Sequence, residues 1–289
     1  MRLGLGLGLS RGRGAAGATG ILDAYTGAAF AFAPDTLIYG THSVTDNEVG
    51  SVTNGNTDAY TVRVRRSSDN AVSSFTYSEV SDGTLVTWVG VGNDGLVEAA
   101  YDQSGNDNHA TQSTATNQPK IVDNGVLVVE NGKAAMDFDG ANDWLKSLAA
   151  FSQPFTYFVA STKATSSQDI CMLDGDSGTN FVQLKYRDNV NRFIIFAGGV
   201  LDGNIANNNQ NLHYALYNGL NSEIALNDGV KFTGNAGAND PTAITIGSRL
   251  DGSGQFWNDK IQFISLYPSD QSANRTGISN AINNEYNIY

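Results

Sequence analysis

Short runs in which apolar and polar residues alternate follow one another along the chain from residue 60 onward, separated by turns rich in glycine and asparagine. Residues 60–66, YTVRVRR, predict a strand with the tyrosine and the valines on one face and Thr61, Arg63 and Arg65 on the other. Residues 84–91 are β-branched and aromatic and predict a further strand. Alternation with period two, repeated over many short segments, is typical of antiparallel sheets.

Two turn signals join neighbouring apolar runs. Asn131-Gly132 lies between residues 126–130 and 134–138, and Asn227-Asp228-Gly229 lies between residues 223–226 and 230–232. Asparagine and glycine adopt the left-handed backbone that tight hairpins need, so each signal predicts a β-hairpin. Further strands are predicted at residues 155–161, 181–186, 192–197, 212–217, 242–246 and 260–267.

The two ends of the patterned region differ from its middle. Residues 21–39 are apolar and alanine-rich, and their periodicity fits a short helix as well as a strand. Residues 269–286 carry apolar side chains at spacings of four, which predicts one helix with Ser269 or Ser272 as its N-cap. The strands and turns together predict an all-β fold, a two-sheet antiparallel sandwich closed by a short C-terminal helix.

Composition agrees with this fold and narrows the partners. The 289 residues include 32 glycines and only 16% charged side chains, and no repeat or break divides residues 21–289, so we expect a single domain. A net charge of −12 argues against nucleic acid or an anionic membrane as partner, and no run approaches the roughly 20 apolar residues of a membrane span. Cys171 alone forms no internal disulfide, and the three histidines show no metal-ligand spacing, so we expect no metal or cofactor.

Residues 1–20 form a separate glycine-rich arm. Glycine alternates with every leucine from Leu3 to Leu9, which interrupts the continuous apolar core of a signal peptide, so we expect none. The arm carries Arg2, Arg11 and Arg13, and no acidic residue precedes Asp23. It is either disordered or an attachment segment; the arginines favour docking on a neighbouring subunit, and hence a homo-oligomer.

Residues 101–112, YDQSGNDNHATQ, are the most distinctive string in the chain. Asparagine, aspartate and serine side chains bond back onto nearby backbone, so the string predicts a structured polar loop. We expect Asp102 to anchor the loop by accepting backbone N–H bonds, and His109 to be a hydrogen-bonding residue and not a base. The residues assigned to this loop are Tyr101, Asp102, Gln103, Ser104, Asn108 and His109.

The string closely resembles a segment of the α-L-arabinofuranosidase B family, whose catalytic domain is a concanavalin-like sandwich, and it recurs in modules of phage virion proteins. Residues 60–70 (YTVRVRRSSDN), 132–140 (GKAAMDFDG) and 266–270 (LYPSD) also resemble that family. The resemblance begins at about residue 57, and residues 1–40 match nothing in the enzyme. The paired strings VRRSSDNA and YDQSGN are more similar to the phage modules. The tail also resembles the closing strands and helix of laminin-G and concanavalin-like jelly rolls.

The resemblance implies a retaining glycosidase scaffold, which needs a carboxylate nucleophile and a carboxylic acid about 5 Å apart. The family's nucleophile position falls on Gln183, and a neutral amide cannot form the glycosyl ester. Its pair of adjacent cysteines is reduced to Cys171. Its acid/base position falls on Arg249, with Asp251 two residues on. The resemblance therefore implies an inherited scaffold without the chemistry, in which Gln183 and Asp251 could still contact sugar.

Other residues carry two readings each. Trp144 and Trp257 adjoin polar turns and could either stack on sugar faces or cap the sandwich core. The arginines of residues 63–66 could face an acidic partner or pair with acids on a neighbouring strand. Four aspartates in glycine turns could be calcium ligands or ordinary turn residues: Asp139, Asp143, Asp174 and Asp176.

The leading hypothesis is a phage virion structural protein, a head or tail fibre or a capsid decoration protein. Its sandwich would stand on the virion surface and bind host or environmental glycans weakly, and the N-terminal arm would dock on other virion proteins. It would be made in the host cytoplasm. A second hypothesis is an arabinofuranosidase that uses Asp251 with Glu223 or Asp188. A third is a free lectin-like module that uses Trp144 or Trp257.

Overall fold

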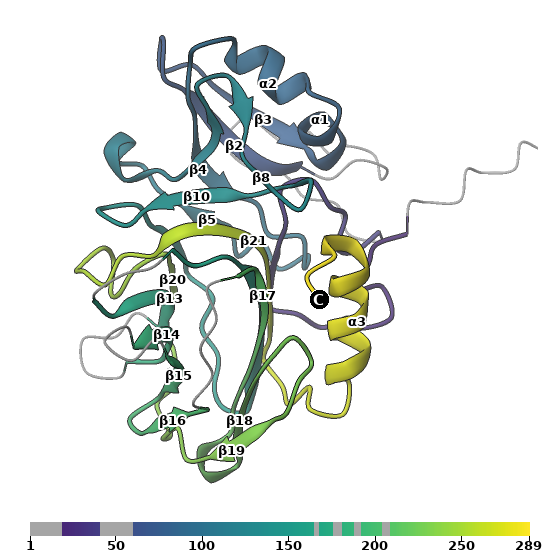
Figure 1. Ribbon diagram of the computed structural model, residues 1–289, viewed down its shortest axis with the longest axis vertical. Coiled ribbons are helices and arrows are strands. Elements are labelled where there is room, and N and C mark those ends of the chain that lie inside the picture. Colours follow the sequence, from purple (N-terminus) through teal and green to yellow (C-terminus); the bar gives the residue numbers. More distant parts are fainter. Residues whose placement is uncertain (1–18, 41–59, 165–167, 176–180, 188–191, 204–208) are drawn as a thin grey trace, which may run out of the picture.

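The computed structural model describes residues 19–40, 60–164, 168–175, 181–187, 192–203 and 209–289 (Figure 1). Nearly all of its regular structure is antiparallel strand, in a large sheet that curls into an almost closed sandwich, and the predicted all-β fold is confirmed. The strands are β1 Phe30–Phe32, β2 Tyr60–Arg66, β3 Val72–Thr76, β4 Gly95–Ala100, β5 Ala110–Thr111, β6 Lys120–Asp123, β7 Val126–Leu127, β8 Val129–Glu130, β9 Lys133–Ala134, β10 Met136–Asp139, β11 Leu145–Ser147, β12 Phe155–Ser161, β13 Ile170–Gly175, β14 Gln183–Arg187, β15 Arg192–Phe196, β16 Val200–Asp202, β17 Asn211–Tyr217, β18 Ser222–Leu226, β19 Phe232–Gly234, β20 Ile244–Ile246 and β21 Asn258–Tyr267.

Strand β12 lies at the centre, between β17 and β21, and every one of its residues is buried. Alternate side chains face opposite ways along a strand. One set, with Tyr157, joins the main core inside the sandwich. The other set, with Phe158, packs outward against the helix α3 (Arg275–Tyr286), which covers this side of the sheet in Figure 1. Burial on both faces explains why the strand reads as a continuous apolar run.

The N-terminal segment, which fitted helix or strand, contributes β1 to the sheet. Phe30 pairs with Leu266 of β21, and the three residues of β1 are fully buried. Tyr39 on the same segment bonds Tyr267, with 3.1 Å between their hydroxyl oxygens. Residues 1–18, which include most of the predicted arm with Arg2, Arg11 and Arg13, lie outside the described residues.

Residues 84–91 are not a strand, and that prediction is wrong. They form the helix α2 (Thr84–Val89), which follows a shorter helix, α1 (Tyr77–Ser81). Leu85 and Val89, four residues apart, are buried on one side of α2, and Trp88 packs edge-on against Phe75 at 5.3 Å between ring centroids. Tertiary burial therefore overrides the β preference of the β-branched residues here.

In strand β2, Val62 and Val64 face the main core, as predicted. A bulge lies between Tyr60 and Val62, and Thr61 is fully buried, with its hydroxyl donating to the Pro34 carbonyl. The arginines of residues 63–66 pair within the protein, which was one of the two interpretations of these residues. Arg63 lies 3.4 Å from Glu98 of the adjacent β4, and Arg66 lies 2.7 Å from Asp69.

Both predicted hairpins are present. β8 and β9 pair across Asn131-Gly132, and β18 pairs with β19 across residues 227–231. The C-terminal helix is confirmed, but it starts at Arg275 with Asn274 at the N-cap position, so the prediction of Ser269 or Ser272 is wrong. No helix among the described residues is long and apolar enough to cross a membrane.

Candidate ligand-binding site

A shallow pocket lies on the strands β14 to β16, which lie below β20 in Figure 1. Along β14, Leu184 and Tyr186 point into the core, so the alternate residues Gln183, Lys185 and Arg187 point to the opposite face. The pocket has a volume of about 290 Å³. Its lining residues are Phe181, Gln183, Lys185, Arg187, Ile194, Phe196, Val200, Arg249 and Gln255.

The rim of the pocket is a tight loop that follows β20. Arg249 and Gly254 form an isolated antiparallel bridge, and Leu250 and Asp251 between them both have positive φ. Gly247 at the start of the loop has φ +85°, and a Cβ there would lie 2.3 Å from a ring carbon of Phe138. The loop therefore needs glycine at this position. It carries Arg249 over the ring of Phe181, with its guanidinium carbon 4.4 Å from the ring centroid.

A buried carboxylate fastens the strand and the loop together. Oδ2 of Asp174 accepts one hydrogen bond from Nε2 of Gln183 at 3.1 Å and another from the backbone N–H of Leu250 at 3.3 Å. Burial raises the pKa of Asp174 to about 6, against the lowering effect of these two bonds. Asp174 is fully buried behind the pocket, and its two bonds position Gln183 and the loop that carries Arg249.

The structure brings Gln183 and Arg249 together, as the family resemblance implied for the two catalytic positions. Asp251 points away from them: its carboxylate lies 2.7 Å from Nζ of Lys146 and accepts a bond from Thr245. Asp251 is therefore absent from the pocket lining, and its predicted sugar contact is not supported. Among the described residues that line this pocket there is no carboxylate.

The other carboxylates proposed for catalysis lie elsewhere. Glu223 on β18 pairs with Lys231 at 2.7 Å and accepts a bond from the Tyr214 hydroxyl at 2.9 Å. Asp188 lies outside the described residues. Cys171 lies buried on β13, and burial raises the pKa of its thiol.

The two tryptophans take supporting positions. Trp257 is fully buried, with its ring 6.1 Å from that of Tyr186, so its prediction as a sugar-stacking residue is wrong and its core-capping reading holds. Trp144 is half-buried and packs behind the Arg249 loop: a Cβ on Gly252 would lie 2.5 Å from its Nε1. Trp144 thus supports the rim of the pocket without lining it.

The distinctive loop at residues 101–112 is an anchor, as predicted for Asp102. The Asp102 carboxylate accepts backbone N–H bonds from Ala31 at 2.9 Å, Ser104 at 2.8 Å and Asn108 at 3.0 Å, and one from the Ser104 hydroxyl at 2.8 Å. Nδ1 of His109 accepts from the Asp102 backbone N–H, which agrees with a hydrogen-bonding role.

The neighbouring loop residues serve the same end. Gln103 accepts a bond from the Ile38 N–H and donates to the carbonyls of Ala33 and Thr36. Asn108 donates to the Ala29 carbonyl. Tyr101 packs its ring at right angles on the His109 ring. The loop therefore fixes the N-terminal segment and β1 to the sandwich.

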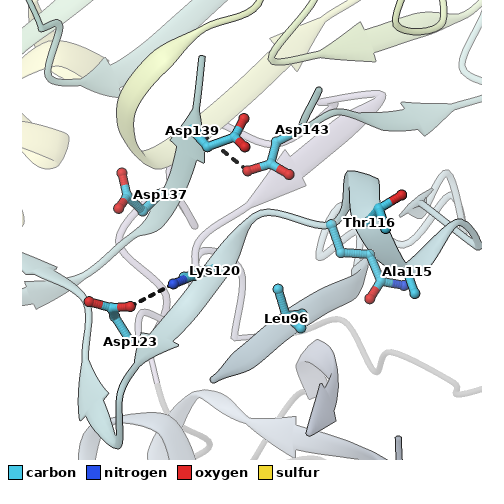
Figure 2. A pocket seen from close by; sticks show the side chains of 9 residues that line it. Leu96, Ala115, Thr116, Lys120, Asp123, Asp137, Asp139 and Asp143 are labelled. Carbon is cyan, nitrogen blue, oxygen red and sulfur yellow. Dashed lines mark hydrogen bonds and ion pairs between the residues drawn. The ribbon is translucent and has the colours of Figure 1, made fainter. Parts of the chain in front are cut away.

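A second, acidic pocket of about 380 Å³ lies beside β6 and β10. Figure 2 shows Asp137, Asp139 and Asp143 gathered on one side of it and the Lys120–Asp123 ion pair on the other. Burial, together with the charge of Asp139, raises the pKa of Asp143 to about 7. Oδ2 of Asp143 accepts a bond from the Asp139 N–H at 3.0 Å, as a turn residue does.

Within the ranges that the structure describes, no group of three or more histidine, cysteine, aspartate or glutamate side chains is placed to hold a metal ion. Asp174 lies behind the other pocket, where it bonds Gln183, and Asp176 lies outside the described residues. Asp139 and Asp143 act in their turn, so the turn-forming reading of these aspartates fits the geometry.

The fold is that of the arabinofuranosidase-B-like β-sandwiches. Three solved structures of α-L-arabinofuranosidases are similar over 91% of this chain. A GH54 enzyme with a glutamate-to-glutamine substitution, soaked with 4-nitrophenyl α-L-arabinofuranoside, matches at 14% identity and a TM-score of 0.62. An arabinofuranosidase complexed with arabinofuranosyl-α-1,2-xylobiose matches at 16% and 0.61, and a GH54 enzyme soaked with a cyclic sulfate inhibitor at 15% and 0.60.

These likenesses are to the fold. The chain spans 64% of the length of each of the three enzymes. No protein-family model matches the sequence, and no curated protein matches it.

Proposed function

We propose that this chain is a glycan-binding β-sandwich that does not hydrolyse its ligand and serves as a structural module of a phage virion. One observation carries the first part. The pocket that holds both positions implied as catalytic is lined by Gln183 and Arg249, with no carboxylate among its described residues. A retaining glycosidase requires two carboxyl groups about 5 Å apart. An amide and a guanidinium can hold a sugar by hydrogen bonds but cannot act as nucleophile and acid.

Binding of glycan is supported by the composition of the pocket. Phe181 supplies an aromatic ring, and Gln183 and Gln255 supply amides that can pair with hydroxyl groups. The similar arabinofuranosidases were solved with an arabinofuranoside and with an arabinofuranosyl-xylobiose. A furanoside-containing oligosaccharide is therefore the first ligand to test.

Titration calorimetry of the purified chain with arabinofuranosyl oligosaccharides tests binding. Phe181→Ala should weaken it because the ring that lines the pocket is lost. Phe232→Ala is a matched control, because Phe232 is partly exposed on β19, away from the pocket lining. Saturable binding that falls only in Phe181→Ala is the expected result. Equal losses in both variants would place any binding elsewhere.

The virion role rests on the resemblance of VRRSSDNA and YDQSGN to phage modules, and on the acidic net charge that suits an exterior surface. Quantitative mass spectrometry of purified particles would give the copy number of the chain. Hundreds of copies indicate a capsid decoration protein, and a few to a few tens indicate a fibre. Absence from the particle would contradict the virion role and leave a free lectin-like module.

A glycosidase is the second candidate, and Asp174 is the observation that favours it. Its carboxyl lies one hydrogen bond behind Gln183, and burial brings its pKa to about 6, within the range of catalytic acids. Incubation with 4-nitrophenyl α-L-arabinofuranoside between pH 4 and 7 should release no nitrophenol. Turnover that disappears in Asp174→Asn would establish the enzyme and refute the non-hydrolytic function.

A further inference from the structure

The pocket described above concentrates positive charge in a strongly acidic protein. Three cationic residues line it, Lys185 and Arg187 from alternate positions of β14 and Arg249 from the loop after β20, whereas the whole chain carries a net charge of −12. None of the described lining residues is an acid that would neutralise them locally. Such a concentration, against the overall charge, favours an anionic ligand.

The three cations are not equally compensated. Nζ of Lys185 lies 3.2 Å from the Asp169 carboxylate, so its charge is paired within the protein. Arg187 and Arg249 form no ion pair with a carboxylate in the described part of the chain. The charge of Arg249 is directed over the face of Phe181, which leaves the edge of the guanidinium to donate hydrogen bonds.

The surroundings keep these two guanidinium groups available. Phe181 and Phe196 border the pocket with apolar surface, which strengthens hydrogen bonds to a charged donor by reducing the local dielectric. The carboxylate behind the pocket, Asp174, is fully buried and spends Oδ2 on Gln183 and Leu250. It weakens the positive field but does not occupy the donors of Arg187 or Arg249.

We propose that this pocket binds a glycan through a negatively charged group, a carboxylate or a sulfate, which Arg187 and Arg249 hold. This inference rests on the proposed glycan-binding function and names the chemistry of its ligand. Planar guanidinium groups bind the oxygens of carboxylates and sulfates in bidentate fashion. The amide of Gln183 and the ring of Phe181 would contact the sugar that bears the charge. An acidic sugar, either a uronic acid or a sulfated residue, is therefore the expected class.

Titration calorimetry on the full chain would use four probes: trigalacturonate, a sulfated galactose trisaccharide, neutral arabinotriose and inorganic sulfate. We expect the charged saccharides to bind more tightly than arabinotriose, and their affinity to fall as salt is raised. Arg249→Gln and Arg187→Gln should each weaken binding by roughly tenfold or more, because each removes a charge-assisted hydrogen bond. Arg249→Lys keeps the charge and should restore part of the affinity.

Arg192→Gln is the matched control. Arg192 lies opposite Arg187 on the neighbouring strand, but its guanidinium pairs with Asp202 at 3.0 Å and does not line the pocket. Its replacement should change affinity by less than about twofold, since only a screened charge is lost. Circular dichroism spectra and melting curves of all variants would establish that each one is folded.

The outcomes separate this inference from the function on which it rests. Preference for trigalacturonate or for the sulfated trisaccharide identifies the charged group. Arabinotriose binding as tightly as the charged saccharides would overturn the inference and leave neutral-glycan binding in place. Inorganic sulfate binding as tightly as the saccharides would reduce the pocket to a simple anion site and overturn it too. Binding of no probe, or equal binding by the arginine variants and wild type, would also refute it, and the first of these would remove the glycan-binding function as well.

Discussion

Replacing Asp102 tests whether the distinctive polar loop is a structural anchor. Oδ1 accepts from the N–H groups of Ala31 and Ser104, and Oδ2 accepts from the Asn108 N–H and the Ser104 hydroxyl. Asp102→Ala leaves three backbone donors without an acceptor. Asp102→Asn can keep the amide oxygen in the position of Oδ1, but its NH₂ group cannot accept the two bonds made by Oδ2.

The magnitude follows from the burial of the donors. An unsatisfied buried donor costs about 1–3 kcal/mol. Ala31 is fully buried and Ser104 nearly so, whereas Asn108 is half-buried and can bond water instead. We therefore expect Asp102→Ala to lower the free energy of unfolding by about 4 kcal/mol and Asp102→Asn by about 2 kcal/mol. For a protein of this size, each 1 kcal/mol corresponds to roughly 2–4 °C in melting temperature.

The assay is urea unfolding followed by tryptophan fluorescence, together with melting temperatures, for wild type and variants. Asp107→Asn is the control: it removes the same charge from the same loop, but Asp107 is exposed and the structure gives its side chain no backbone donor. It should stay within about 0.5 kcal/mol of wild type. An Asp102→Ala protein less than about 1 kcal/mol below wild type would show that the loop does not anchor β1.

Three further predictions concern the core and the pocket loop. Burial lowers the pKa of His213 from 6.5 to about 4. The contribution of neutral His213 to the free energy of unfolding is therefore fully present above pH 6.5 and is lost as the pH falls toward 4. His213→Gln should reduce the pH dependence of stability in urea unfolding over that window by up to about 3 kcal/mol. Burial raises the pKa of Asp174, so its effect on stability has the opposite pH dependence. Its contribution to the free energy of unfolding is fully present below pH 3.8 and is lost as the pH rises through about 6. As the pH rises from about 4 to about 7, the free energy of unfolding of Asp174→Asn should therefore increase relative to that of wild type by up to about 3 kcal/mol. A difference between the two that does not depend on pH would contradict the raised pKa. Gly247→Ala should cost about 3 kcal/mol in urea unfolding, because its Cβ would lie 2.3 Å from Phe138. Gly132→Ala, with φ +79° and nothing within 4 Å, should cost only about 1 kcal/mol, and equal losses would show that backbone strain alone decides.

The local pattern of apolar and polar residues was enough to predict those strands whose tertiary contacts agree with that pattern. β12 and β17 match the predicted runs at residues 155–161 and 212–217 almost residue for residue, and both are buried throughout. The hairpin at Asn131-Gly132 depends only on the conformations of its own turn residues, so it too could be predicted. Helix α2 could not, because its sequence TLVTWV is β-branched and only packing against the main core makes it helical.

The site shows the same division between local and distant causes. Alternation along the predicted strand at residues 181–186 already places Gln183 and Lys185 on one face. That Arg249 meets them depends on the pairing of β13 with both β14 and β20, which no local pattern reveals. Two basic residues at alternate positions of one strand were a sign of the cationic pocket in the sequence. Nothing in the sequence indicated that the loop after β20 completes the pocket. Trp257, beside a polar turn, gave no local sign that its ring would be fully buried.

Two buried aspartates explain why residues 101–112, the most distinctive string in the chain, form a structural loop and not the candidate ligand-binding site. Asp102 and Asp174 each accept bonds from segments that are far apart in sequence, Asp102 from Ala31 and Asp174 from Leu250. Both oxygens of Asp102 accept bonds from within the protein, and Asp174 is fully buried, so the two carboxylates hold backbone in place. Under the proposed function, the ligand would be held by cationic groups that form no ion pair with the carboxylates of the described residues, and in this pocket those groups are the guanidinium groups of Arg187 and Arg249. The polar string at residues 101–112 therefore carries information about the scaffold, whereas the ligand that we propose would be selected by less distinctive positions on β14 and in the loop after β20.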